Sequence, residues 1–151
     1  MAAWRRICCP VDFTAPSRLA LRVAAELAQA SKAHLTLLLV TGRRVGPANV
    51  FAPPSALGPG RRRREAFAAW LEEAEALAPG RVDSAVLSGV ADEQVLGFAE
   101  ECGFDLIVVG TAGPRRVFRR ASPLAEALLR RAAIPVLFVP PTSPGPATAT
   151  A

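Results

Sequence analysis

The sequence has few residues that commonly bind metals or act as nucleophiles. Its 151 residues include one histidine, His34, and three cysteines, Cys8, Cys9 and Cys102. They form no CxxC or Cys/His spacing, so a zinc site, a Cys–His nucleophile pair and a Ser–His–Asp triad are poorly supported. Cys8 and Cys9 are neighbours in a short apolar run that predicts a strand, where adjacent side chains point to opposite faces. We therefore expect buried, reduced thiols.

Long hydrophobic runs are also missing. No apolar stretch approaches the roughly 18 residues that span a bilayer, and the run behind Arg5 and Arg6 stops at 10–12, too early for a signal-peptide core. We expect a cytoplasmic protein that does not bind membranes. A chain of 151 residues that is 51% hydrophobic and 21% charged fits one domain with a buried core. We place this domain at 1–140, followed by a disordered tail at 141–151.

Lysine is nearly absent, and the net charge of +5 comes almost entirely from arginine, since Lys32 is the only lysine. The largest charge run is 61–64, four arginines at the start of an expected helix, where the helix dipole disfavours cations. The run is either an anion or partner contact or a solvated helix face, and we favour the solvated face. Aromatic residues are few and show no repeated basic–aromatic pattern, so specific binding of RNA or DNA is not expected.

Strand and helix patterns alternate along the whole chain. Apolar runs predict strands at 7–11, 34–40, 82–87, 105–110 and 135–139, and helical periods or caps predict helices at 14–31, 61–77, 91–102 and 122–132. This alternation predicts a Rossmann-like α/β fold, a five-stranded parallel open twisted sheet with helices on both faces. The Gly- and Pro-rich stretch 41–60 is expected to be a long loop, either mobile or a lid.

Apolar stripes predict the buried helix faces. In helix 14–31 the stripe comprises Leu19, Val23, Leu27 and Ala30. In helix 61–77 the period is clearer, with apolar side chains at Phe67, Trp70, Leu71, Ala74 and Leu77.

Ligands of such folds bind at the carboxyl ends of the strands. Gly110-Thr111-Ala112-Gly113 follows a strand, and Ser122-Pro123 begins a helix. Glycine N–H groups and a helix N-terminus attract anions, and the arginines between them, such as Arg115, can pair with phosphate. Asp12 ends the first strand and can accept hydrogen bonds from a ribose or an adenine.

Each of these features also has a simpler interpretation. The glycines form an ordinary turn, Ser122 caps a helix, and Asp12 caps the first helix or forms a salt bridge. Neither GxxxxGK[ST] nor GxGxxG is present.

Three segments carry a resemblance to a known family. They are ICCPVDFT at 7–14, DLIVVGT at 105–111 with Gly113 two residues on, and AEALLRRA at 125–132 followed by IPVLFV at 134–139. In this order and spacing, over about residues 5–140, the sequence resembles the universal stress protein family. The resemblance implies the fold of the adenine-nucleotide alpha-hydrolases.

The resemblance also implies a nucleotide site. Members of the family that bind ATP hold it with three elements. These are a Pro-Val-Asp at the end of the first strand, a residue after the second strand and a G-x2-G-x9-G-[S/T] loop. Carried over by position, the implied contacts and their neighbours are Pro10, Val11, Asp12, Val40, Gly110, Thr111, Gly113, Arg115 and Ser122. The last element departs from the pattern, because Ser122 and Pro123 replace its glycine and Ser/Thr, the loop is one residue shorter, and proline has no N–H.

The implied function is that of a dimeric stress-response regulator that binds ATP or AMP, with Mg²⁺ accompanying ATP. The family's last strand pairs across a two-fold axis, which implies a homodimer through 136–139. No general base, metal cluster or nucleophile is evident, and Glu126 is expected to be structural, so strong catalytic activity is not expected. The alternatives are a protein-interaction module that has lost nucleotide binding, and a slow ATPase or autophosphorylating protein with Mg²⁺ at Asp12 and Ser122 or Thr111 as acceptor.

Overall fold

The computed structural model describes residues 4–41, 57–111 and 123–141. Strands and helices alternate along these residues in the order β1(Arg6–Val11), α1(Ala15–Ser31), β2(His34–Thr41), α2(Leu57–Leu77), β3(Val82–Ser88), α3(Ala91–Glu101), β4(Leu106–Gly110), α5(Pro123–Arg131) and β5(Val136–Val139). Every boundary lies within about one residue of the one expected from the sequence, except the start of α2. This helix begins at Leu57, so part of the expected loop 41–60 is helical.

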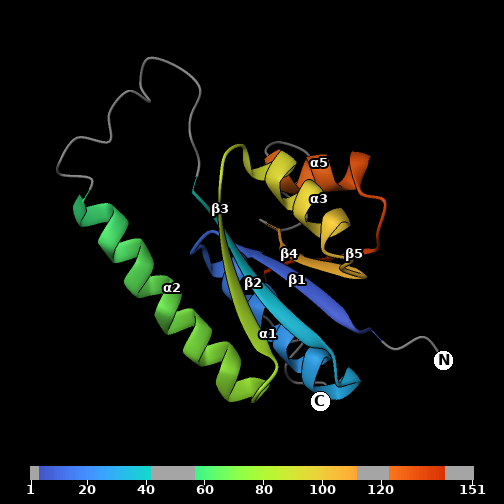
Figure 1. Ribbon diagram of the computed structural model, residues 1–151, viewed down its shortest axis with the longest axis horizontal. Helices are drawn as coiled ribbons and strands as arrows, with labels where there is room; N and C mark the ends of the chain where they lie inside the picture. Colours follow the sequence, from blue (N-terminus) through green and yellow to red (C-terminus); the bar gives the residue numbers. More distant parts are fainter. Residues whose placement is uncertain (1–3, 42–56, 112–122, 142–151) are drawn as a thin grey trace.

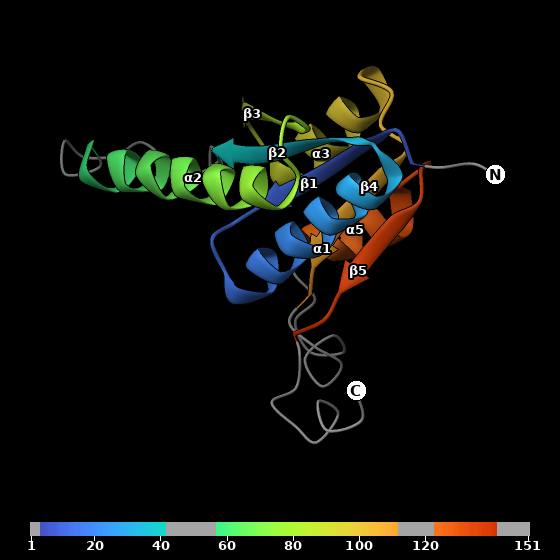
Figure 2. The same ribbon diagram turned by 90° about the horizontal axis from the view of Figure 1, so that it is seen from below.

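The strands form one parallel sheet in the order β3-β2-β1-β4-β5. Helices α1 and α2 cover one face, and α3 and α5 cover the other (Figures 1 and 2). The predicted fold is therefore confirmed. The chain adds β2 and β3 on one side of β1 and then returns to add β4 and β5 on the other. Such a reversal opens a crevice at the carboxyl ends of the two central strands.

The core has two parts, one on each face of the sheet. Cys9 packs with the part under α1 and α2, and Cys8 packs with the part under α3 and α5. Burial raises the pKa of the Cys8 thiol to about 12 and that of Cys9 well above its ordinary value, so both stay protonated. The expectation of buried thiols is confirmed for these two, whereas Cys102 is partly exposed.

The buried face of α1 differs from the expected one. Leu19, Val23 and Leu27 are only partly buried against the core, and Ala30 is exposed. The face against the sheet consists of Ala20, Leu21, Ala24, Ala25 and Ala28. Small side chains let the helix lie close to β1 and β4, and the larger apolar residues then pack at its flanks. The predicted buried face was therefore wrong, because the observed face is displaced by about one residue position around the helix axis.

Helix α2 is fastened to α1 by ion pairs around Glu73. The Nε atoms of Arg18 and Arg22 lie 3.0 and 2.7 Å from the two carboxylate oxygens. Partial burial acts to raise the pKa of Glu73, but the hydrogen bonds and charges of the two arginines outweigh it and lower that pKa overall. These contacts fix the position of α2 along α1. No helix among the described residues is both long and apolar enough to cross a membrane.

Candidate functional site

The central strands β1 and β4 separate toward their carboxyl ends. β1 pairs with β2 as far as Val11, but its register with β4 covers only Ile7 and Cys8. The Arg6 carbonyl accepts a hydrogen bond from the Asp105 N–H (2.9 Å), so every second residue after Arg6, including Pro10, faces β4. Proline has no N–H to donate at that position. The ladder therefore ends before Pro10, and a gap opens beside β1.

A cavity of about 280 Å³ occupies this gap. Five residues implied by the sequence line it together: Pro10, Val11, Asp12, Val40 and Gly110. They come from the carboxyl ends of three strands, where the fold places ligands. The structure therefore brings these five residues together.

Asp12 has one carboxylate oxygen engaged in the turn and a second that takes no described hydrogen bond. Its Oδ1 accepts hydrogen bonds from the N–H (3.0 Å) and the hydroxyl (2.5 Å) of Thr14, which is the N-cap of α1. Its own N–H donates to the Ser17 hydroxyl at 3.0 Å. Thr14, and not Asp12 as considered from the sequence, caps the helix, and Asp12 instead holds the N-cap residue in place. Within the described residues Oδ2 has no partner, so it can accept hydrogen bonds from a ligand.

Phe13, directly after Asp12, adopts an unusual backbone conformation, with φ 64°. The left-handed region costs a bulky residue roughly 1–2 kcal/mol, and surrounding contacts must hold it there. The Phe13 ring packs edge-on against Trp70 of α2, with the centroids 5.2 Å apart. This contact joins the turn that carries Asp12 to the helix that forms the neighbouring wall of the cavity.

Val40 lies just beyond the paired part of β1 and β2. The register ends at Val11 and Leu39, whereas β2 continues against β3 through Val40 and Thr41. The His34 N–H donates to the Arg5 carbonyl, so strand alternation turns the carbonyl of Val40 toward β1 as well. That carbonyl is therefore positioned to accept a hydrogen bond from a ligand in the gap.

Gly110 ends β4 against the first turn of α1. A Cβ atom there would lie 2.7 Å from the Ser17 nitrogen and still closer to the Pro16 carbonyl. No side chain fits in this space. Glycine is thus required for packing, whatever ligand the cavity holds.

Of the other implied residues, Thr111 is the one whose position the structure describes. Thr111 is partly buried, does not line the cavity, and donates its N–H to the Val139 carbonyl at 2.9 Å. Gly113, Arg115 and Ser122 lie outside the described residues, as does the expected tail from 142 onward. Glu126 forms an i, i+4 ion pair with Arg130 at 2.7 Å, which is consistent with a structural role.

Sequence reasoning missed several cavity residues. They are Ser17, Leu38, Arg63, Ala91, Val95, Val109 and Leu124. The position of Arg63 could have been predicted from the sequence, because it precedes Phe67 and Trp70 by four and seven residues and so shares their helix face. Arg63 is exposed, as the solvated-face interpretation of the run 61–64 expects, but it also lines the cavity. The adjacent Arg62 and Arg64 are exposed and do not line the cavity.

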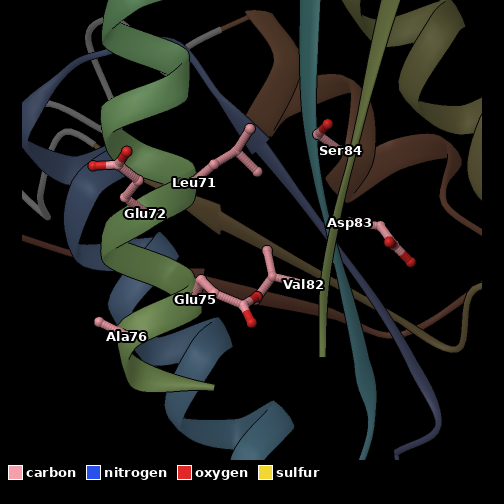
Figure 3. A pocket seen from close by; sticks show the side chains of 7 residues that line it. All are labelled: Leu71, Glu72, Glu75, Ala76, Val82, Asp83 and Ser84. Atoms are coloured by element: carbon pink, nitrogen blue, oxygen red, sulfur yellow. The ribbon is translucent and has the colours of Figure 1, made fainter. Parts of the chain in front are cut away.

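A second and larger hollow, of about 680 Å³, lies between α2 and β3 (Figure 3). Its lining includes the carboxylates of Glu72, Glu75 and Asp83, which would repel an anion, and it contains none of the implied site residues. Among the residues with described positions, no group of three or more His, Cys, Asp or Glu side chains is placed to hold a metal. The smaller cavity is therefore the candidate site.

Comparison with protein families gives one match that covers most of the chain. The model of the universal stress protein family matches residues 3–140. The chain belongs to the universal stress protein family. The resemblance carried by the three sequence segments is confirmed. Comparison with curated proteins finds no significant match.

Solved universal stress proteins share the fold. UspA from Lactobacillus plantarum is 20% identical over 92% of this chain and 99% of its own, with a TM-score of 0.77. A family protein from Burkholderia pseudomallei is 28% identical over 94% and 99%, with a TM-score of 0.65. A universal stress protein from Archaeoglobus fulgidus, solved in complex with dAMP, is 17% identical over 91% and 99%, with a TM-score of 0.65.

Gly110→Ala tests the packing requirement at the end of β4. We expect this variant to lower the free energy of unfolding by about 2 kcal/mol, because α1 must move away from the sheet. Gly97→Ala in α3 is the matched control, since nothing lies within 4 Å of the added methyl group, and better helix propensity should stabilise it by up to about 1 kcal/mol. Urea denaturation measures both. Equal stability of Gly110→Ala and the parent protein would contradict the described contact.

Proposed function

We propose that this universal stress protein binds an adenine nucleotide between the carboxyl ends of β1 and β4. It then acts as a dimeric stress-response regulator in the cytoplasm, without strong catalytic activity. One observation carries the proposal: Pro10, Val11, Asp12, Val40 and Gly110 line one cavity.

The chemistry of the cavity suits a nucleoside. Leu38, Val95 and Val109 give it apolar walls against which a purine can pack. Oδ2 of Asp12, which takes no hydrogen bond from the residues that the structure describes, can accept hydrogen bonds from ribose hydroxyls or an exocyclic amine. The Val40 carbonyl supplies a second acceptor. A mostly apolar pocket with a few placed polar groups is typical of cofactor sites.

The A. fulgidus relative supports the same ligand class, since its structure is described as a complex with dAMP. ATP is one candidate for this chain and AMP another. With ATP, Mg²⁺ would be held by Asp12 together with phosphate oxygens, in keeping with the preference of Mg²⁺ for one or two carboxylates and the substrate's own phosphates.

Homodimerisation through β5 is the second part of the proposal. β5 is an edge strand with one paired neighbour, β4. Its four residues are all apolar, and Leu137 is 38% exposed. An apolar edge of this kind is an aggregation hazard unless another chain covers it. Pairing of two β5 strands across a two-fold axis would cover it.

A substitution that fills the cavity tests the ligand site. Ala91, the first residue of α3, is exposed and lines the cavity, so Ala91→Trp should block the cavity without disturbing the core. We expect isothermal titration to give binding of adenosine, AMP or ATP by the parent protein and at least about tenfold weaker binding by Ala91→Trp. Ala76→Trp is the matched control, because Ala76 is an exposed alanine in the α2–β3 hollow, and it should bind like the parent.

Three results would count against this proposal. Folded parent protein that binds no adenine compound would favour the interaction-module alternative. Binding unaffected by Ala91→Trp would place the ligand elsewhere. Sustained release of phosphate from Mg²⁺-ATP would favour the slow ATPase instead.

Two lysine variants, one on each edge strand of the sheet, test the dimer interface. We expect the parent protein to sediment at about twice the 15.9 kDa mass of the chain, and Leu137→Lys to sediment as a monomer, because a buried lysine would lie in the β5 interface. Val86→Lys places the same charge on the opposite edge strand, at a site that is 57% exposed, and should remain dimeric. A monomeric parent protein, or dissociation caused by Val86→Lys alone, would contradict the interface.

A further inference from the structure

Arg63 brings a positive charge to the cavity from an element that the sequence did not connect with it. Among the described residues that line the cavity, it is the one cationic side chain, and Asp12 is the one anionic side chain. The Arg63 guanidinium carbon lies 6.0 Å from the ring centroid of Phe13, the residue after Asp12. The arginine is therefore beside the turn that carries the candidate ribose contact.

The direction of Arg63 follows from the packing of α2. Phe67 and Trp70, on the same helix face, are buried and partly buried, and Trp70 contacts Phe13. Glu73 fixes the helix against α1 through two arginines. Arg63, one helical turn before Phe67 on this face, is exposed and lines the cavity from the α2 side.

The guanidinium has no anionic partner in the described part of the chain. No ion pair or hydrogen bond of Arg63 is found there, and its one described contact is with the Phe13 ring. Asp12 Oδ1 is already engaged by Thr14. A guanidinium has five N–H donors, which match the oxygens of a phosphate or carboxylate.

The charges around the cavity differ between its two sides. On the α3 side, the first turn of the helix carries Asp92, which forms an ion pair with Arg131 at 3.7 Å, and Glu93, which has no ion pair within the described residues and disfavours an anion. On the α2 side, Arg63 lies between Arg62 and Arg64 in sequence, so the local charge is positive. A phosphate attached to a nucleoside in the cavity is therefore drawn toward α2.

We propose that Arg63 forms a phosphate subsite of this cavity and pairs with the phosphate of a bound adenine nucleotide. This inference rests on the proposed function. It differs from the site implied by the sequence, in which Gly113, Arg115 and Ser122 approach the phosphates. The helix after that segment begins with Pro123, which has no N–H to offer an anion. An arginine from α2 provides a charge that compensates for this departure.

The test compares adenosine with AMP, because the two ligands differ only by the phosphate. Arg63→Gln should weaken AMP binding about tenfold, the scale of a charge-assisted contact near a protein surface, and change adenosine binding less than about twofold. Arg64→Gln removes the same charge from the next residue, which does not line the cavity, and should leave both affinities unchanged. Arg63→Lys should restore part of the AMP affinity. Thermal unfolding checks that each variant is folded.

The outcomes separate this inference from the proposed function. If Ala91→Trp abolishes adenosine binding while Arg63→Gln binds AMP normally, the cavity binds the nucleoside and the phosphate subsite is wrong. Equal weakening of adenosine and AMP by Arg63→Gln would assign Arg63 to the nucleoside and overturn the phosphate contact. If Arg63→Gln and Arg64→Gln weaken AMP binding equally, the effect comes from the net positive charge of α2 and the specific contact with Arg63 is wrong. If the parent protein binds neither compound, both proposals fail.

Discussion

Pro10 lacks a backbone N–H on the side of β1 that faces β4, and the candidate site depends on this absence. The parallel ladder between these central strands ends at Cys8, so their carboxyl ends separate. The resulting gap is the cavity lined by Pro10 and Val11 on one side and Val109 and Gly110 on the other. In an ordinary central strand a proline is disfavoured because it breaks the ladder. Here the broken ladder creates space for a ligand where the sheet order reverses.

The remaining walls follow from how α1 and α2 meet this opening. Gly110 lets the first turn of α1 approach β4 closely, and Thr14 and Ser17 then tie Asp12 to that turn. The strained conformation of Phe13 is held by its contact with Trp70, so α2 packs beside the turn and brings Arg63 to the cavity. Each step uses backbone fit or apolar packing, and the polar groups of the site are positioned as a result. We therefore expect the site to be formed before any ligand binds.

The sequence predicted the sheet well because buried parallel strands are short apolar runs, and the motifs around Asp12 and Gly110 follow two of them directly. It predicted the buried face of α1 less well, because alanines carry little hydrophobic signal and the larger Leu19, Val23 and Leu27 dominated the pattern. Arg63 was missed for a different reason. Its proposed role depends on how α2 packs against Phe13, through a contact between residues 57 positions apart in the chain (Phe13 and Trp70). In a run of four consecutive arginines, the sequence does not distinguish Arg63, which lines the cavity, from Arg62 and Arg64, which do not.

The central claim is that the gap between β1 and β4 binds an adenine nucleotide. The most direct test is titration of the ¹⁵N-labelled protein with AMP, observed through its backbone amide signals. We expect the largest shifts at Val11, Asp12, Ala91 and Gly110, around the cavity, and very small shifts of the Glu75 and Ser84 amides in the α2–β3 hollow. Shifts concentrated around the α2–β3 hollow, at residues such as Glu75 and Ser84, or no shifts at all in the folded protein, would contradict this claim.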